Sequence, residues 1–206
     1  MAVCACPAQG VEVLDRVVAS VGSQAITQSD VEQEYRLEQF LDGKFPEAPP
    51  ASELQPARER LTSQTVLALE LEPEATAASE FQKAATLRLE TVRRRFVSPE
   101  AYEKALHALG MTEPQVLQQL VLQQRILTMI DQRLRPATSA GPDEIEAYYH
   151  STFVPEYVQR NGGTPPALSE VESQIREILI QKEIDRLLAE WLEELRPNRR
   201  VRFHSF

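Results

Sequence analysis

Three histidines, two cysteines and one pair of glycines are the residues whose types could support catalysis or metal binding. His107, His150 and His204 each stand alone, without a second histidine or a carboxylate at metal-ligand spacing. Gly162-Gly163 lacks the following Lys-Ser/Thr and the preceding strand of a phosphate-binding loop. Carboxylates are numerous, but no spacing selects a catalytic pair. We therefore predict no catalytic residue, no metal site and no cofactor, and paired carboxylates stay open as the enzymatic alternative.

The cysteines lie close together near the start of the sequence. Cys4 and Cys6 are the only two, which excludes a disulfide framework, a cysteine zinc site and a thiol nucleophile in the core. The segment Met1–Gly10 is small and weakly apolar, like the tail of a secretory signal peptide. We expect residues 1–10 to be a signal-peptide remnant or a disordered leader. Val3-Cys4-Ala5-Cys6 also resembles a lipoprotein cleavage site, which keeps lipidation of Cys4 or Cys6 open.

The composition favours a mainly helical protein. The chain has 206 residues, of which 42% are hydrophobic and only 6% aromatic, with seven glycines. Few aromatics and glycines disfavour an all-β sandwich or barrel. The 22 basic and 31 acidic residues give a net charge of −9, which argues against nucleic acid and anionic membrane surfaces as partners. No apolar run reaches the roughly 18 residues of a membrane span.

The two ends of the chain carry the strand signals. A β-branched run over Val11–Val21, closed by Gly22-Ser23 and followed by Ala25–Thr27, predicts a hairpin. Ser29, with Glu32 three residues later, predicts a capping box for a helix that ends near Leu41. The alternating residues 200–204 predict a short strand. Because so short a strand needs a partner, we expect the chain ends to meet.

Between these ends, apolar residues recur at helical spacing in several stretches. We expect helices over 57–71, 74–96, 99–109, 113–134, 143–157 and 169–196. Capping residues would be Ser98, Thr112 and Ser169, with Gly110 at one C-terminus and Pro197 as the final helix breaker. The prolines at 46, 49, 50 and 56 predict a stiff connector. Arg93-Arg94-Arg95 suits a solvated helix C-terminus, with an anion or acidic-peptide site as the alternative.

Wide apolar faces on these helices would either fill the core or line a groove for a peptide. The helix over 113–134 is the most apolar of the interior, and an aromatic patch follows in the helix over 143–157. Apolar or aromatic residues near the Pro/Gly loops are the candidate groove residues: Val116, Leu120, Leu127, Tyr148, Tyr149, Phe153 and Trp191. The residues alone leave core and groove as equal alternatives.

The order of elements resembles the SurA family of periplasmic chaperones. Leu14–Val31 is similar to the family's opening strand, turn, return strand and Ser-Asp-Val helix start. Ala57–Glu70 and Phe96–Arg135 resemble its next helices, and Pro142–Tyr149 resembles the helix that leads into a parvulin prolyl isomerase domain. Ile178–Phe203, with Glu190-Trp-Leu-Glu-Glu-Leu-Arg196, resembles the C-terminal helix and strand. The resemblance therefore covers roughly residues 11–204.

One departure from the family bears on activity. Only nineteen residues, 150 to 168, separate Tyr149 from Ser169. A parvulin domain needs on the order of 100 residues, and its histidines and glycine-rich signature have no counterpart. The resemblance thus implies a chaperone module without the isomerase: a single domain over 11–206, in which helix 169–196 and strand 200–204 fold back on the N-terminal part.

The resemblance implies a function that composition does not. We expect a periplasmic chaperone (a holdase) that binds unfolded or outer-membrane protein segments in an apolar groove, without ATP. Residual prolyl isomerisation is one alternative. A scaffold protein that buries its helices in a homodimer is the other.

Overall fold

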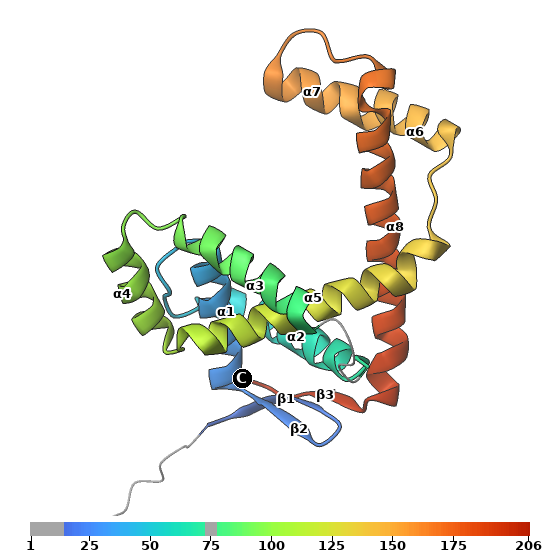
Figure 1. Ribbon diagram of the computed structural model, residues 1–206. Coiled ribbons are helices and arrows are strands. Elements are labelled where there is room, and N and C mark those ends of the chain that lie inside the picture. The colour runs from blue at the N-terminus through green and yellow to red at the C-terminus, as the bar shows by residue number, and fades with distance from the viewer. Residues whose placement is uncertain (1–14, 73–77) are drawn as a thin grey trace, which may run out of the picture.

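The computed structural model describes residues 15–72 and 78–206. The predictions for the leader, Cys4 and Cys6 lie outside the described residues. The described chain is mainly helical with one small antiparallel sheet, as predicted. Figure 1 shows a body at the lower end, from which a long helix, α8 (Leu168–Asn198), carries a smaller helical arm away.

The sheet joins the two ends of the described chain. Its strands are β1 (Val17–Val21), β2 (Gln24–Thr27) and β3 (Val201–Phe203), in the order β2-β1-β3. Gly22 has a φ of 60°, which suits a type II′ turn between β1 and β2. β3 pairs antiparallel with β1, with Arg202 opposite Ser20. The predicted hairpin and the predicted meeting of the chain ends are confirmed.

The first helix, α1 (Gln28–Leu41), begins two residues earlier than predicted. Its N-cap is Thr27, whose hydroxyl accepts from the backbone N–H of Asp30. The Asp30 carboxylate accepts in return from the backbone N–H of Thr27, at 2.9 Å. The prediction of Ser29 as the cap is wrong because β2 ends at Thr27, so the chain turns into the helix there.

The next helix, α2 (Ala51–Ala68), also begins earlier than predicted, and Pro56 lies inside it. The stiff connector is therefore shorter than residues 46–56. A proline in a helix leaves the carbonyl four residues earlier without its partner. Here that residue is Ser52, which is exposed together with Pro56, so water can bind the free carbonyl.

The remaining helices follow the predicted order. They are α3 (Ala78–Arg93), α4 (Pro99–Leu109), α5 (Glu113–Leu134), the 3₁₀ turn η1 (Arg135–Ala137), α6 (Pro142–Tyr148), the π-helical turn η2 (Tyr149–Phe153) and α7 (Val154–Asn161). Ser98 caps α4, Thr112 caps α5 and Gly110 has a φ of 73°, as predicted. The α8 N-cap, however, is Ala167 rather than Ser169, and Pro197 lies within the last turn of α8.

Three apolar clusters hold these elements together. The first packs the sheet, α2 and the C-terminal halves of α5 and α8 around residues such as Trp191. The second packs α1, α3, α4 and the N-terminal half of α5 around Phe40, whose ring lies 5.4 Å from those of Phe96 and Tyr102. The third, far smaller, holds the arm, with Ile145 and Ile175 at its centre.

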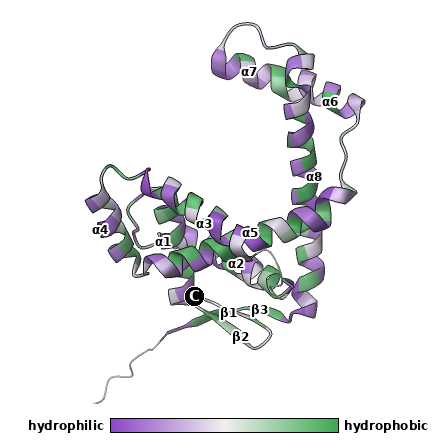
Figure 2. Cartoon of the chain, in the orientation of Figure 1, coloured by the Kyte–Doolittle hydropathy of each residue, from purple (hydrophilic) through white to green (hydrophobic). Residues whose placement is uncertain are grey.

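Helix α8 connects the body to the arm. Figure 2 shows hydrophobic residues interspersed with hydrophilic ones along its whole length. The C-terminal half contributes Ile184 and Leu195 to the first cluster, while Val171 and Ile175 near its start belong to the third. In the described ranges, no helix is both long and apolar enough to cross a membrane.

Candidate functional site

The structure separates the predicted groove residues into two groups. Val116 and Leu120 on α5 are buried in the second cluster, and Trp191 on α8 is buried in the first. The wide apolar face of α5 packs against α3, α2 and α8, and the guanidinium of Arg133 covers the Trp191 ring at 4.4 Å. These three side chains leave no surface for a ligand, so we no longer count them as binding residues.

The other four candidates lie at the surface or in the arm. Leu127 on α5 is 53% exposed. Tyr148, Tyr149 and Phe153 are half-buried in the arm, where they pack against its small cluster. The candidate site therefore moves from the centre of α5 to the arm (residues 142–161).

Three rings form an aromatic column along the arm. Tyr149 and Phe153 stack with ring centroids 5.8 Å apart and an interplanar angle of 18°. Phe153 and Tyr157 stack at 6.0 Å and 30°. All three are half-buried, and Val158, beside the last ring, is 47% exposed. The aromatic column (Tyr149, Phe153 and Tyr157) thus offers apolar surface that the arm only partly covers.

The arm holds this column in place through few contacts. Ile145 packs against Val171 and Ile175 of α8. The Tyr149 hydroxyl donates to the Pro166 carbonyl at 2.8 Å, which fixes the ring against the loop that leads into α8. The ammonium of Lys182 lies 4.5 Å from the centre of the Tyr148 ring. The loop before α8 thus orders the Tyr149 ring, while all three rings of the column stay only half-buried.

A wide helical turn lies at the middle of the column. Residues Tyr149–Phe153 form a π-helical turn, and Pro155 follows directly in α7. Pro155 has no N–H to donate to Ser151, and its ring would crowd that carbonyl in a regular α-helix. The wider turn relieves this conflict. Such turns are rare and often lie at functional sites.

A shallow cavity lies in the angle between α5 and α8, below the arm. Its volume is about 440 Å³, and its lining includes Leu127 of α5 and Gln181 and Ile184 of α8. Arg135 fixes this angle, because its guanidinium contacts Asp131 at 2.6 Å and Glu177 at 2.9 Å. These two carboxylates raise the pKa of Arg135 above its already high value. In Figure 1, α5 and α7 extend from α8 toward the same side.

The basic cluster at the end of α3 has partners within the chain. Arg93 donates to both carboxylate oxygens of Glu113, at 2.9 and 2.8 Å. Arg95 donates to the Leu41 carbonyl at 2.8 Å. These contacts favour a structural role for the basic helix end over an anion or acidic-peptide site. In residues 15–72 and 78–206, no group of three or more His, Cys, Asp and Glu side chains could hold a metal ion.

Sequence reasoning missed one member of the column. Tyr157 follows Tyr149 and Phe153 at a constant spacing of four residues, which places side chains on one helix face. This spacing was a usable signal. Tyr157 is the last residue of the helix predicted over 143–157, so the sequence pattern already places all three rings on one helix face.

Comparisons of the chain with protein-family models, with curated proteins and with solved structures find no match.

Proposed function

We propose that the protein is a chaperone that holds extended apolar segments of unfolded proteins without ATP. The aromatic column is the observation that carries this proposal. Stacked rings present apolar area at a low cost in side-chain entropy, because they are already ordered before a ligand binds. Each contact would gain about 25 cal/mol per Å² of apolar area buried, before ordering costs.

The client would lie along the arm and α8. Rings at spacings of about 6 Å match side chains that alternate along an extended chain, since successive residues on one side of a strand are about 6.6 Å apart. Leu127 and the cavity between α5 and α8 would receive a further side chain. We propose outer-membrane proteins in the periplasm as clients, because the SurA-like order of elements implies them.

We propose no catalytic step for this protein. The SurA family carries its parvulin domain at the position of residues 150–168. In this chain these residues lie in η2, α7 and the short loop that leads into α8. A protease-free assay on a proline-containing peptide should show no acceleration by micromolar protein. Clear acceleration would replace the holdase proposal with the enzymatic alternative.

The deciding experiment follows light scattering from an outer-membrane β-barrel protein diluted out of urea. The wild-type protein should slow its aggregation. In the double variant Tyr157→Ala/Val158→Ala, about tenfold more protein should be needed for the same effect, because aromatic anchors dominate such interfaces. Tyr157 and Val158 lie outside the arm's small cluster, so the arm should stay folded.

A matched control separates the column from general hydrophobicity. Leu87 on α3 is 64% exposed, and Leu87→Ala should behave as wild type. Failure of the wild-type protein to slow aggregation overturns the proposal. A tight dimer by light scattering, with no binding of a hydrophobic dye, would instead favour the scaffold alternative.

A further inference from the structure

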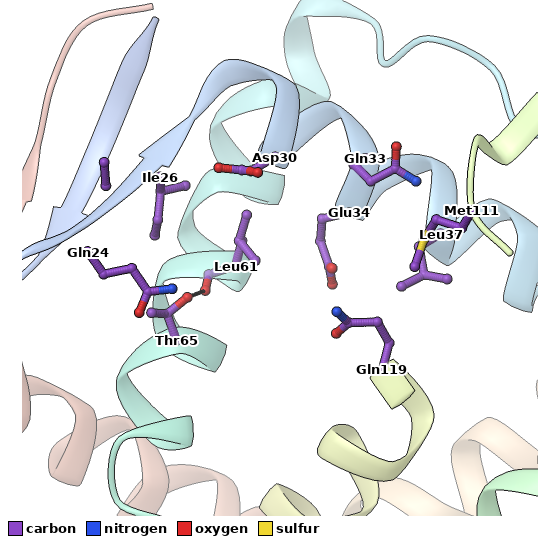
Figure 3. A pocket seen from close by; sticks show the side chains of 11 residues that line it. Gln24, Ile26, Asp30, Gln33, Glu34, Leu37, Leu61, Thr65, Met111 and Gln119 are labelled. Carbon is purple, nitrogen blue, oxygen red and sulfur yellow. Dashed lines mark hydrogen bonds between the residues drawn. The ribbon is translucent and has the colours of Figure 1, made fainter. Parts of the chain in front are cut away.

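A second cavity lies in the body, away from the arm. Its volume is about 220 Å³. A cavity of about 10–15 Å³ is enough for a single water, so this one has room for a larger ligand. The walls come from β2, α1, α2 and α5 and from Met111, which precedes α5. Figure 3 shows Glu34 of α1 and Gln119 of α5 pointing into this cavity toward each other. The cavity therefore joins elements that are distant in the sequence.

Glu34 is the unusual residue of the cavity. It lies on the buried face of α1, between Val31 and Leu37, and is itself partly buried. Within the described ranges its carboxylate has neither a hydrogen bond nor an ion pair, unlike Asp30, which completes the Thr27 capping box. A partly buried carboxylate without a partner is costly. A ligand with the opposite charge would remove that cost.

The charges around Glu34 do not neutralise it. Arg60, the basic group whose charge lowers the pKa of Glu34, donates to Glu38 and forms an ion pair with it. Burial raises the pKa of Glu34 to about 7; the negative charge of Glu38 raises it as well, and Arg60 partly opposes both. Asp30, at the exposed rim, adds further negative potential. The cavity thus favours the entry of a cation.

The other walls define the rest of the ligand. Ile26, Leu37 and Leu61 contribute apolar surface suited to methylene groups. The Thr65 hydroxyl donates to the Leu61 carbonyl at 2.8 Å, so its lone pairs are available to accept. Gln119 adds an amide group, whose nitrogen faces Glu34 in Figure 3. An ammonium group carries three donors and no acceptor, which fits the Glu34 carboxylate beside the Thr65 hydroxyl oxygen.

We propose that this cavity binds an alkylammonium group, with the ammonium on Glu34 and its methylene stem against Leu37 and Leu61. Such a group could belong to a free amine or to a lysine side chain of a polypeptide. The inference is independent of the holdase proposal, because it uses no residue of the arm.

The test is an NMR titration of the full chain with n-butylammonium chloride at pH 8. The Glu34 side-chain signals should shift, with a Kd on the order of millimolar. The neutral n-butanol should cause no comparable shift. Between pH 8 and pH 5.5 the association constant should fall about 30-fold, since protonation of a group with a pKa near 7 removes the charge.

Two variants make the result specific. Glu34→Gln should abolish binding while the protein stays folded. Glu32→Gln removes one acid from the same helix, outside the cavity lining, and should leave binding unchanged. Absence of a Glu34 shift up to about 50 mM amine, equal binding of n-butanol, or binding retained by Glu34→Gln would each overturn the proposal.

A second arm of the titration identifies the source of the ammonium group. Tighter binding of a lysine-containing extended peptide than of n-butylammonium supports a polypeptide ligand. Equal or weaker binding of the peptide supports a free amine. If the wild-type protein binds the amine but does not slow aggregation of the unfolded client, only the holdase proposal is contradicted.

Discussion

Glu34 shows how a single residue can oppose the fold that contains it. Its neighbours on the same helix face, Val31 and Leu37, are buried, so the helical pattern places a carboxylate where apolar residues belong. The sequence contains this signal, because positions three residues apart share a helix face. It does not reveal that Arg60 would pair with Glu38 instead, since that choice depends on how α2 packs against α1.

The first prediction concerns the pH dependence of stability. The pKa of Glu34 rises from an ordinary value of 4.5 to about 7 on folding, so the folded protein holds this proton more tightly than the unfolded chain. This contribution to stability is fully present below pH 4.5 and is lost as the pH rises to about 7. Glu34→Gln should therefore stabilise the protein at pH 8 by about 2 kcal/mol more than at pH 4.

Urea unfolding of wild type and Glu34→Gln at both pH values measures this difference. Glu32→Gln is again the control, since Glu32 pairs with Arg36. If the stability difference between wild type and Glu34→Gln is the same at pH 4 and pH 8, Glu34 does not titrate as the structure indicates.

At the scale of the element, the start of α1 shows what local patterns leave undecided. Two capping patterns overlap in the sequence: Ser29 with Glu32, and Thr27 with Asp30. The structure uses the second, because Thr27 is the last residue of β2 and pairs with Val17 of β1. The backbone N–H of Ser29 donates instead to the Asp15 carboxylate, at 3.3 Å. Pairing between strands thus decided where the helix begins.

Removing each of the two possible caps in turn tests this interpretation. Thr27→Ala should lower the free energy of unfolding by about 1 kcal/mol, because the backbone N–H of Asp30 loses its acceptor and the Asp30 carboxylate loses the hydroxyl that donates to it. Ser29→Ala should change it by less than about 0.5 kcal/mol. Chemical denaturation measures both variants. An equal or larger loss in Ser29→Ala would restore the sequence-based prediction.

The elements also show why the candidate site was only partly predictable. Helical periodicity located α5, but it could not distinguish a face that packs on α3 from one that meets solvent. Val116 and Leu120 are therefore in the core, while Leu127, about three and two turns farther along the same helix, is exposed. In the arm, the spacing of four residues places the three rings on one helix face, and the arm has few neighbours that could cover them.

At the scale of the whole molecule, α8 determines the arrangement. With 31 residues, it is about 46 Å long at 1.5 Å per residue, and only part of this length packs against the body. Its second half packs in the first cluster, and its first half carries the arm (Figure 1). The sequence predicted the helix and its return to the N-terminal strand. It did not predict that half of this helix would leave the body, because that depends on which apolar residues find partners.

The closure of the sheet by β3 gives the last prediction. Val201–Phe203 pairs with β1, and the backbone N–H of His204 donates to the Val18 carbonyl at 2.9 Å. Because hydrogen-bonded pairs alternate along an antiparallel ladder, the pair Arg202–Ser20 is also hydrogen-bonded. Arg202→Pro removes this donor and should destabilise the protein by about 2–4 kcal/mol.

Trp191 reports on this change, because it is the single tryptophan of the chain and lies in the same cluster as β1. Its fluorescence during urea unfolding should show a lower midpoint for Arg202→Pro, while the exposed control Arg202→Ala should stay within about 0.5 kcal/mol of wild type. A large loss of stability is expected for Arg202→Pro, although the substitution alters only one strand of three residues. β3 holds the end of α8 to the sheet, so its release also loosens the helix that carries the arm. If Arg202→Pro unfolds like Arg202→Ala, the two chain ends do not stabilise each other, and α8 must be anchored by its contacts with α2 and α5 alone.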